Sequence, residues 1–274
     1  MNVWVKLQQI CETPMERPTN YGWFHLVFFA LSILAGILLC VTHKKGNDAR
    51  VRRAVFFTGV IVILLEIFKM FVYSFYIEDN KLLWDFQWYV FPWQFCSIPM
   101  YVSLLTGIIR KGRVHQSLVA FLATYAIFAG LCVMLYPNDV FIGQIGVNIQ
   151  TMVCHGSMLT IGIYLYGSGY VKTEHKTILR AIPVFAVAVS VAALLNEVVY
   201  KSGILAGETF NMFFISPYFE GTLPVYSLVQ KVVPFPWCLF IYIAVFTLAA
   251  YVMLLGAMGL RKLFGKRKTQ EKEA

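Results

Sequence analysis

The chain has 274 residues, of which 59% are hydrophobic and only 14% are charged, and its formal net charge is +9. This composition leaves too little polar surface for a soluble domain. It also argues against nucleic acid as a partner, because the basic residues lie in short clusters between long apolar blocks. Blocks of about 20 apolar residues match a bilayer and must be helical, since lipid offers backbone groups no other partner. The sequence therefore predicts an all-α, polytopic membrane helical bundle.

Hydropathy predicts seven transmembrane helices along the chain. The first is expected to be retained, because it is too long for the core of a signal peptide and ends in basic residues. The expected organisation is an outer N-terminal segment (1–21), a seven-helix transmembrane domain (22–260) and a basic cytoplasmic tail (261–274). The predicted spans cover residues 22–41, 54–76, 90–109, 117–136, 146–167, 181–200 and 236–260.

The basic residues also predict the orientation. Most of the 23 lysines and arginines fall in the tail and in the loops after the first, third and fifth spans. Since basic loops stay in the cytoplasm, the N-terminus is expected outside and the C-terminus inside. We therefore expect an integral, multi-pass membrane protein, in the plasma membrane if its source is bacterial.

Polar residues inside the predicted spans are the candidate functional residues, because burying them in lipid is costly. Helical rise from the predicted span ends places all of them in the outer half of the bilayer. Their similar depth predicts one shared cavity open to the outer side. These residues are Glu66, Lys69, Cys96, Asn148, His155, Asn196 and Glu197.

Several of these residues also have a purely structural interpretation. Glu66 and Lys69 are spaced i,i+3 and can simply neutralise each other. Cys96 can be a small buried hydrophobic residue. Asn196 and Glu197 can mark an interfacial helix end without chemistry.

His155 has a row of polar neighbours on its own helix face. Asn148 and Thr151 precede it by seven and four residues, so the row serves either as contacts between helices or as a support for the imidazole. Cys154 points about 100° away from His155 and is expected to be the poorer partner for its site. The remaining histidines are expected at the surface, and they are His25, His43, His115 and His175.

Together these residues suit thiol chemistry. Cys96 is the candidate nucleophile, His155 the base that takes its proton, and Glu66 or Glu197 the carboxylate that orients the histidine. An amide from Asn148 or Asn196 would stabilise the developing oxyanion.

Short segments along the chain resemble one known family. The ten residues 92–101, PWQFCSIPMY, resemble the cysteine-bearing span of the YwaF-like integral membrane family, which includes bacterial YwaF-type proteins and the animal transmembrane protein 164. The resemblance runs from the second span onward. Its other matches are His155-Gly156, Asn211-Met212-Phe213 with Pro217, and Pro234-Phe235-Pro236-Trp237.

The resemblance implies an activity. The animal member is described as a phospholipid acyltransferase that uses a cysteine and a histidine to acylate ether lysophospholipids, and those residues correspond to Cys96 and His155. It implies membrane lipids as partners, with a phospholipid as acyl donor and a lysolipid as acceptor. Asn211, like the other polar residues, is a candidate on physical grounds only. No cofactor or metal is expected, because the sequence contains no P-loop, GxGxxG or CxxC motif.

Other functions remain open at this point. The main alternative is a non-enzymatic transporter or small-molecule-binding protein in which Glu66, Lys69 and Glu197 form a binding or ion-coupling site. A receptor fits the bare topology, and a lipid hydrolase would replace the acyl acceptor with water.

Overall fold

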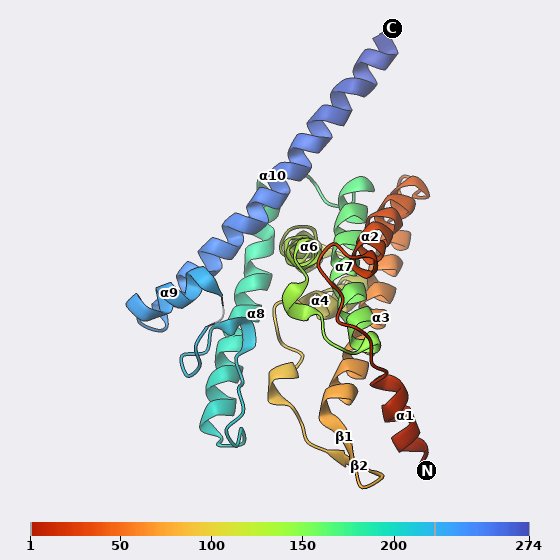
Figure 1. Ribbon diagram of the computed structural model, residues 1–274. Coiled ribbons are helices and arrows are strands. Elements are labelled where there is room, and N and C mark those ends of the chain that lie inside the picture. The colour runs from red at the N-terminus through yellow and green to blue at the C-terminus, as the bar shows by residue number, and fades with distance from the viewer. Residues whose placement is uncertain (1, 222, 274) are drawn as a thin grey trace.

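Long apolar helices form the body of the computed structural model, which describes residues 2–221 and 223–273 (Figure 1). Apart from one two-stranded hairpin and short 3-10 turns, the regular elements are helices. They are α1 (Val3–Cys11), α2 (Trp23–Val41), α3 (Asp48–Ser74), β1 (Phe75–Glu78), β2 (Lys81–Trp84), α4 (Ile98–Ile108), α5 (Gly112–Phe121), α6 (Ile127–Leu135), α7 (Ile145–Gly167), α8 (Lys176–Lys201), α9 (Pro224–Val232) and α10 (Trp237–Glu273).

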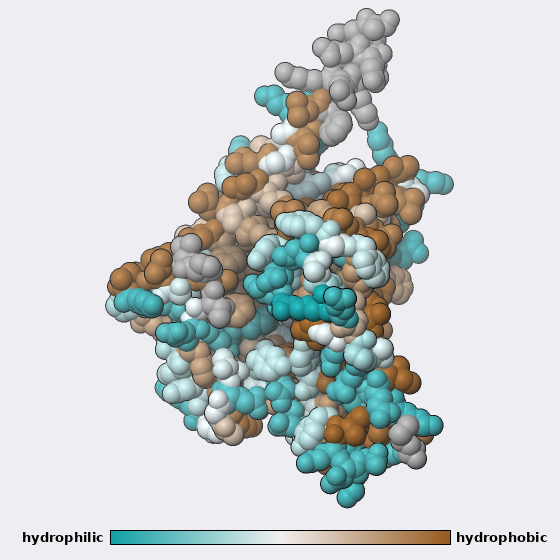
Figure 2. Space-filling model, in the orientation of Figure 1, coloured by the Kyte–Doolittle hydropathy of each residue, from teal (hydrophilic) through white to brown (hydrophobic). Residues whose placement is uncertain are grey.

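Within residues 2–221 and 223–273, five helical stretches are long and apolar enough to cross a membrane. They are α2, α3, α8, the part of α10 from Trp237 to Leu263, and the stretch Gly112–Leu135, in which a π-helical turn joins α5 to α6. Large apolar side chains such as Leu34, Leu64 and Leu248 are exposed on them, and Figure 2 shows apolar surface along α10 and around α2. Exposing so much apolar surface is unfavourable in water, whereas contact with lipid is favourable. The protein is an all-α, polytopic integral membrane protein, as the sequence predicts.

Two of the predicted spans, α7 and α4, differ from these five helices in burial and in length. α7 is long enough to span, but most of its residues are buried inside the bundle and it carries several polar side chains. α4 has 11 residues and is therefore about 16 Å long, roughly half the hydrocarbon thickness. The number of seven spans and the orientation of the termini stay predictions.

The prediction of a continuous helix over 90–109 is wrong, because residues 91–97 are not helical. Two prolines explain the break: Pro92 has no amide hydrogen to donate, and Pro99 fits only the first turn of a helix, where it lies in α4. Cys96 therefore lies in the non-helical segment just before α4, about 16 Å along the helix from its Ile108 end. Non-helical backbone within a membrane bundle has to be buried in protein or line a cavity.

Helix α7 lies at the centre of the bundle, between α2, α3 and α6 (Figure 1). Small residues allow the close approach. A Cβ atom added to Gly130 of α6 would lie 2.6 Å from the carbonyl oxygen of His155, and one added to Gly156 would meet the side chain of Ser32 on α2. Such backbone-level contacts are typical of membrane helix interfaces, and they fix the part of α7 that carries His155.

The N-terminal segment packs against the hairpin end of the bundle. In the hairpin, Phe75 pairs with Trp84. The side chain of Gln8 in α1 donates a hydrogen bond of 2.7 Å to the carbonyl of Phe75, and Met15 donates one of 3.0 Å to Gly143. The two ends of the chain lie at opposite ends of the molecule (Figure 1). In the predicted basic tail, the side chains beyond residue 263 lie outside those that the structure describes.

Candidate functional site

The 91–97 segment crosses the middle of the bundle and is anchored on several sides. The indole of Trp93 donates a hydrogen bond of 3.2 Å to the carbonyl of Ala188 on α8. The amide of Gln94 donates to the carbonyl of Asn211 at 3.0 Å and accepts from the N–H of Phe213 at 2.9 Å. These contacts satisfy backbone groups that have no helical partner, so the segment is a fixed part of the bundle.

Cys96 lies at the end of this segment, just before α4 begins. Its thiol is free and its side chain is half-buried. The positive end of the α4 dipole lies beside it, but the first turn offers few free donors, because Pro99 has no N–H and the N–H of Met100 donates to the carbonyl of Ser97 at 3.2 Å.

A buried carboxylate lies next to Cys96 in the structure. Glu66 of α3 is 4% exposed and accepts hydrogen bonds from Lys69 at 2.6 Å and from Gln150 of α7 at 3.1 Å. The hydroxyl of Ser97 lies 3.5 Å from the same carboxylate. The expected pairing of Glu66 with Lys69 therefore exists, and it is part of a larger network that reaches the residue after Cys96.

The ammonium group of Lys69 keeps donors free for another partner. It has three N–H donors, one of which is used by Glu66, and its side chain is 21% exposed. Its charge acts on Cys96 and on His155, which places all three within electrostatic range of one another.

His155 is 5% exposed and its ring is oriented by its own helix. Its Nδ1 lies 2.7 Å from the carbonyl oxygen of Thr151. Because a carbonyl can only accept, Nδ1 carries the proton and Nε2 keeps its lone pair. The backbone carbonyl of Thr151 thus orients the imidazole, and it leaves His155 in the tautomer that a base requires.

Cys154 provides the direct contact between α7 and the 91–97 segment. Its thiol lies 3.9 Å from the carbonyl oxygen of Cys96. Among the described residues, no hydrogen bond joins the side chains of Cys96 and His155. The structure therefore joins the 91–97 segment to Cys154, the residue that the helical angle made the poorer candidate, and the pairing of Cys96 with His155 stays a prediction.

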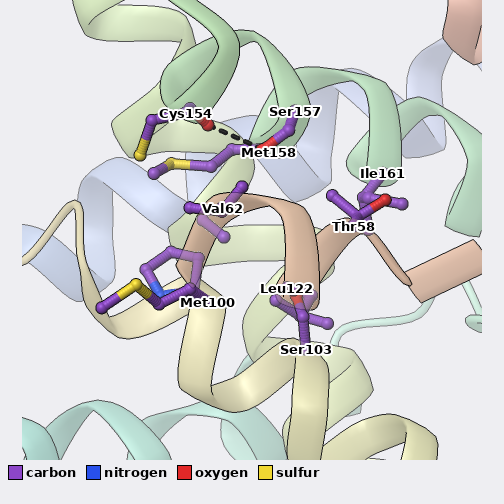
Figure 3. Close-up of a pocket in the computed structure, with 12 residues that line it drawn as sticks. Thr58, Val62, Met100, Ser103, Leu122, Cys154, Ser157, Met158 and Ile161 are labelled. Carbon is purple, nitrogen blue, oxygen red and sulfur yellow. Dashed lines mark hydrogen bonds between the residues drawn. The ribbon is translucent and has the colours of Figure 1, made fainter. Parts of the chain in front are cut away.

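A narrow cavity begins beside Cys154 and lies between α3, α4 and α7 (Figure 3). Its volume of about 10 Å³ is near the lower limit for one water molecule. Val62 and Met100 face Cys154 across it, and the hydroxyl of Ser157 donates a hydrogen bond of 2.7 Å to the Cys154 carbonyl. The packing around Cys154 is thus slightly loose on the side of α4.

Asn196 and Asn211 hold a buried loop. The amide of Asn196 accepts from the N–H of Met212 at 2.8 Å and donates to its carbonyl at 3.0 Å. Asn211 accepts from the N–H of Ser216 at 2.9 Å. Within this 211–216 loop, Phe213 and Phe214 both have a φ of 58°, a left-handed conformation that costs energy for a bulky residue. These contacts assign both asparagines to the loop.

Asn148 likewise forms hydrogen bonds with backbone groups, here those of Ile142 in the loop before α7. Its amide accepts from the N–H of Ile142 at 2.9 Å and donates to the carbonyl of the same residue at 2.7 Å. The oxyanion role that the sequence suggests for Asn148 or Asn196 stays a prediction, and no recorded contact brings either amide to Cys96.

Glu197 does not join the site. Its side chain is 38% exposed and lies 2.5 Å from both Lys201 and the hydroxyl of Tyr218. The hydrogen bond to the carboxylate raises the pKa of Tyr218. The prediction of one cavity shared by every polar residue is therefore wrong for Glu197, because its partners lie at the exposed end of α8.

The surface prediction is also wrong for two histidines. His25 is fully buried and bonds the N–H of Tyr21 and the carbonyl of Met134. His115 is 7% exposed and lies 2.8 Å from the hydroxyl of Tyr170. Across residues 2–221 and 223–273, no group of three or more histidine, cysteine, aspartate or glutamate side chains is arranged to hold a metal ion.

The family follows from comparison with known proteins. The model of the TMEM164 family matches residues 20–254, which include α2 to α9, about half of α10 and the whole 91–97 segment. Comparisons with curated proteins and with solved structures gave no match. Since the family match covers most of the chain, this protein belongs to the TMEM164 family.

Proposed function

We propose that the protein transfers an acyl chain between membrane lipids through a thioester on Cys96. The observation that carries this proposal is the position of the Cys96 thiol: it is free, it precedes the first turn of α4, and its neighbours are Ser97 of the Glu66 network and Cys154, the residue before His155 in α7. Few structural roles require a thiol at a break in a membrane helix. Thioester chemistry does require one that is partly accessible and near a base.

In the first step, Nε2 of His155 takes the proton of the Cys96 thiol, and the thiolate attacks the ester carbonyl of a phospholipid. The N–H of Ile98, at the start of α4, would stabilise the oxyanion, since Pro99 has no N–H and that of Met100 donates to Ser97. The ester C–O bond then breaks, and the leaving alkoxide takes the proton from His155. The products are a lysolipid and an S-acyl group on Cys96.

The second step reverses the first with a different alcohol. The hydroxyl of an acceptor lysolipid gives its proton to His155 and attacks the thioester carbonyl. The C–S bond breaks, and the Cys96 thiolate recovers the proton. A site within the bundle suits these two steps because it limits the access of water, which would otherwise hydrolyse the thioester.

The ammonium group of Lys69 favours a substrate that carries a phosphate group. Its free N–H donors lie within electrostatic range of Cys96, and an ammonium is a common partner for a lipid phosphate. Glu66 acts as a positioning residue, since it holds Lys69, Gln150 and the Ser97 next to the thiol.

An apolar groove that would accept an acyl chain lies behind Phe246, a ring contact of Phe95. This groove of about 200 Å³ lies between α9 and α10 and is lined by Tyr242 and Phe246. The ring of Phe246 lies 5.3 Å from that of Phe95, which precedes Cys96. In a bilayer such a groove would be filled by a lipid chain.

Intact mass spectrometry tests the proposal. The wild type, Cys96→Ala and Cys132→Ala are each incubated with phospholipids that carry a labelled acyl chain. Cys132 is a matched control, since it is a free cysteine exposed in a predicted span away from the site. We expect a hydroxylamine-labile acyl adduct on the wild type and on Cys132→Ala, and none on Cys96→Ala.

An adduct that persists in Cys96→Ala would contradict the proposal, as would the absence of any adduct on a folded wild type. In the second case the Glu66 and Lys69 network is better explained as a binding or transport site, and Cys96→Ser should leave ligand binding intact.

A further inference from the structure

A second polar cavity lies at the other end of the bundle from the hairpin. It has a volume of about 400 Å³ and is lined by the start of α3, the link between α4 and α5, and the link between α7 and α8. These are three of the segments that the positive-inside rule assigns to the cytoplasm. Arg110 follows α4 and Cys96 precedes it, so this basic cavity is separated from the thiol by the length of α4, about 16 Å.

The cavity has a strong excess of positive charge. Five basic side chains line it and only one acidic side chain, Asp48, does so. Arg180 has an ion pair with Glu174 at 3.2 Å, while the other four have no carboxylate within ion-pair distance among the residues that the structure describes. These four are Arg52, Arg110, Lys111 and Lys172.

Further donors surround these charges. α5 begins at Gly112 without a side-chain cap, so its first N–H groups and the positive end of its dipole lie at the cavity. His115, one turn later, lines the cavity, and its Nδ1 is a buried nitrogen without a hydrogen-bond partner in the described structure. An unpaired buried nitrogen is costly, and clustered charges of one sign repel one another.

We infer that this cavity is a binding site for a phosphate group, independent of the acyl-transfer site. A phosphate accepts several charge-assisted hydrogen bonds at once, and arginine matches it with two parallel donors. A basic cavity between membrane helices at the cytoplasmic side suits the headgroup of an anionic phospholipid. A soluble phosphate ester offers the same chemistry, and the cavity is large enough to hold one.

The test measures thermal unfolding of the full-length protein in nanodiscs. Discs of phosphatidylcholine alone are compared with discs that also contain phosphatidic acid, and inorganic phosphate is added to the neutral discs in a separate arm. The site variant is Arg52→Gln/Arg110→Gln. The matched control is Lys44→Gln/Lys45→Gln, which removes two charges from the same side of the protein but outside the cavity.

We expect phosphatidic acid to raise the unfolding temperature of the wild type and of the control, and to leave the site variant unchanged. Loss of two basic contacts should weaken binding about twentyfold. A rise produced by inorganic phosphate alone would support the same site with a soluble ligand. If the site variant fails to fold, Lys111→Gln/Lys172→Gln replaces it.

An equal rise in the site variants and the control would overturn the inference, because general attraction to a charged membrane would then suffice. No rise with either phosphate source would also overturn it. Since the readout is binding, neither result depends on whether Cys96 forms a thioester.

Discussion

The thiol of Cys154 lies 3.9 Å from the carbonyl oxygen of Cys96, and this contact joins the 91–97 segment to the helix that carries His155. A thiol is a weak donor, so the contact contributes placement more than energy. Two cysteines therefore lie side by side, and substituting each in turn distinguishes the proposed nucleophile, Cys96, from its neighbour Cys154.

Cys154→Ala should keep acylation of Cys96. The change removes one buried sulfur beside an existing narrow cavity and should cost about 1 kcal/mol of unfolding free energy. Cys154→Leu should instead displace the 91–97 segment and reduce the adduct, because the cavity has no room for the larger side chain. Intact mass and thermal unfolding measure both effects. Loss of the adduct in Cys154→Ala, with Cys96 present and the protein folded, would make Cys154 the nucleophile.

His155→Gln should slow thioester formation by about 10²–10⁴, the usual contribution of a positioned base. The rate of the variant should rise with pH as hydroxide takes over proton removal. Thr151→Ser is the matched control, since it keeps both the backbone carbonyl and the hydroxyl that lie beside Nδ1 of His155. Single-turnover kinetics with labelled phospholipid provide the measurement, and an equal loss in the two variants would reduce the role of His155 to packing.

Glu66→Gln should destabilise the protein by about 3 kcal/mol, because it leaves the Lys69 charge without its partner in a largely buried place. Lys69→Met in the same chain should restore part of that loss. A double-mutant cycle on unfolding free energies therefore gives a coupling of about 1–3 kcal/mol. Additive effects would show that the pair contributes little and that Glu66 acts mainly through Gln150.

Asn196→Ala and Glu197→Gln should differ sharply although the residues are adjacent. The first leaves the N–H and carbonyl of Met212 unsatisfied in a fully buried place and should cost about 2 kcal/mol or more. The second changes an exposed carboxylate and should leave stability within measurement error. Thermal unfolding in detergent compares them, and equal effects would contradict the assignment of Asn196 to the 211–216 loop.

Hydropathy located every long helix because its signal extends over about 20 residues. It did not detect the break at 91–97, since a window of that length averages over a short apolar coil. The local signal was present in Pro92 and Pro99, seven residues apart on either side of Cys96. A proline in each of two successive turns is hard to place in one continuous helix.

The site was predicted in part for a similar reason. Glu66, Lys69, Cys96 and His155 were recognisable as costly groups in apolar spans. Ser97, Gln94 and Gln150 are polar residues of the same spans, and the sequence does not show that they contact the Glu66 carboxylate or the 211–216 loop. Asn196 was assigned to chemistry because sequence does not reveal that a distant loop, 211–216, folds back to use its amide.

That loop also sets an order for biosynthesis. The carbonyl of Phe213 accepts a hydrogen bond of 3.1 Å from the hydroxyl of Tyr242 in α10, and the neighbouring backbone depends on Gln94 and Asn196 from earlier parts of the chain. A ribosome produces Phe213 before Tyr242, so the loop lacks one of its partners until the last long helix has left the translocon. Nascent chains that stop before α10 should therefore be recognised by membrane quality control as unfinished.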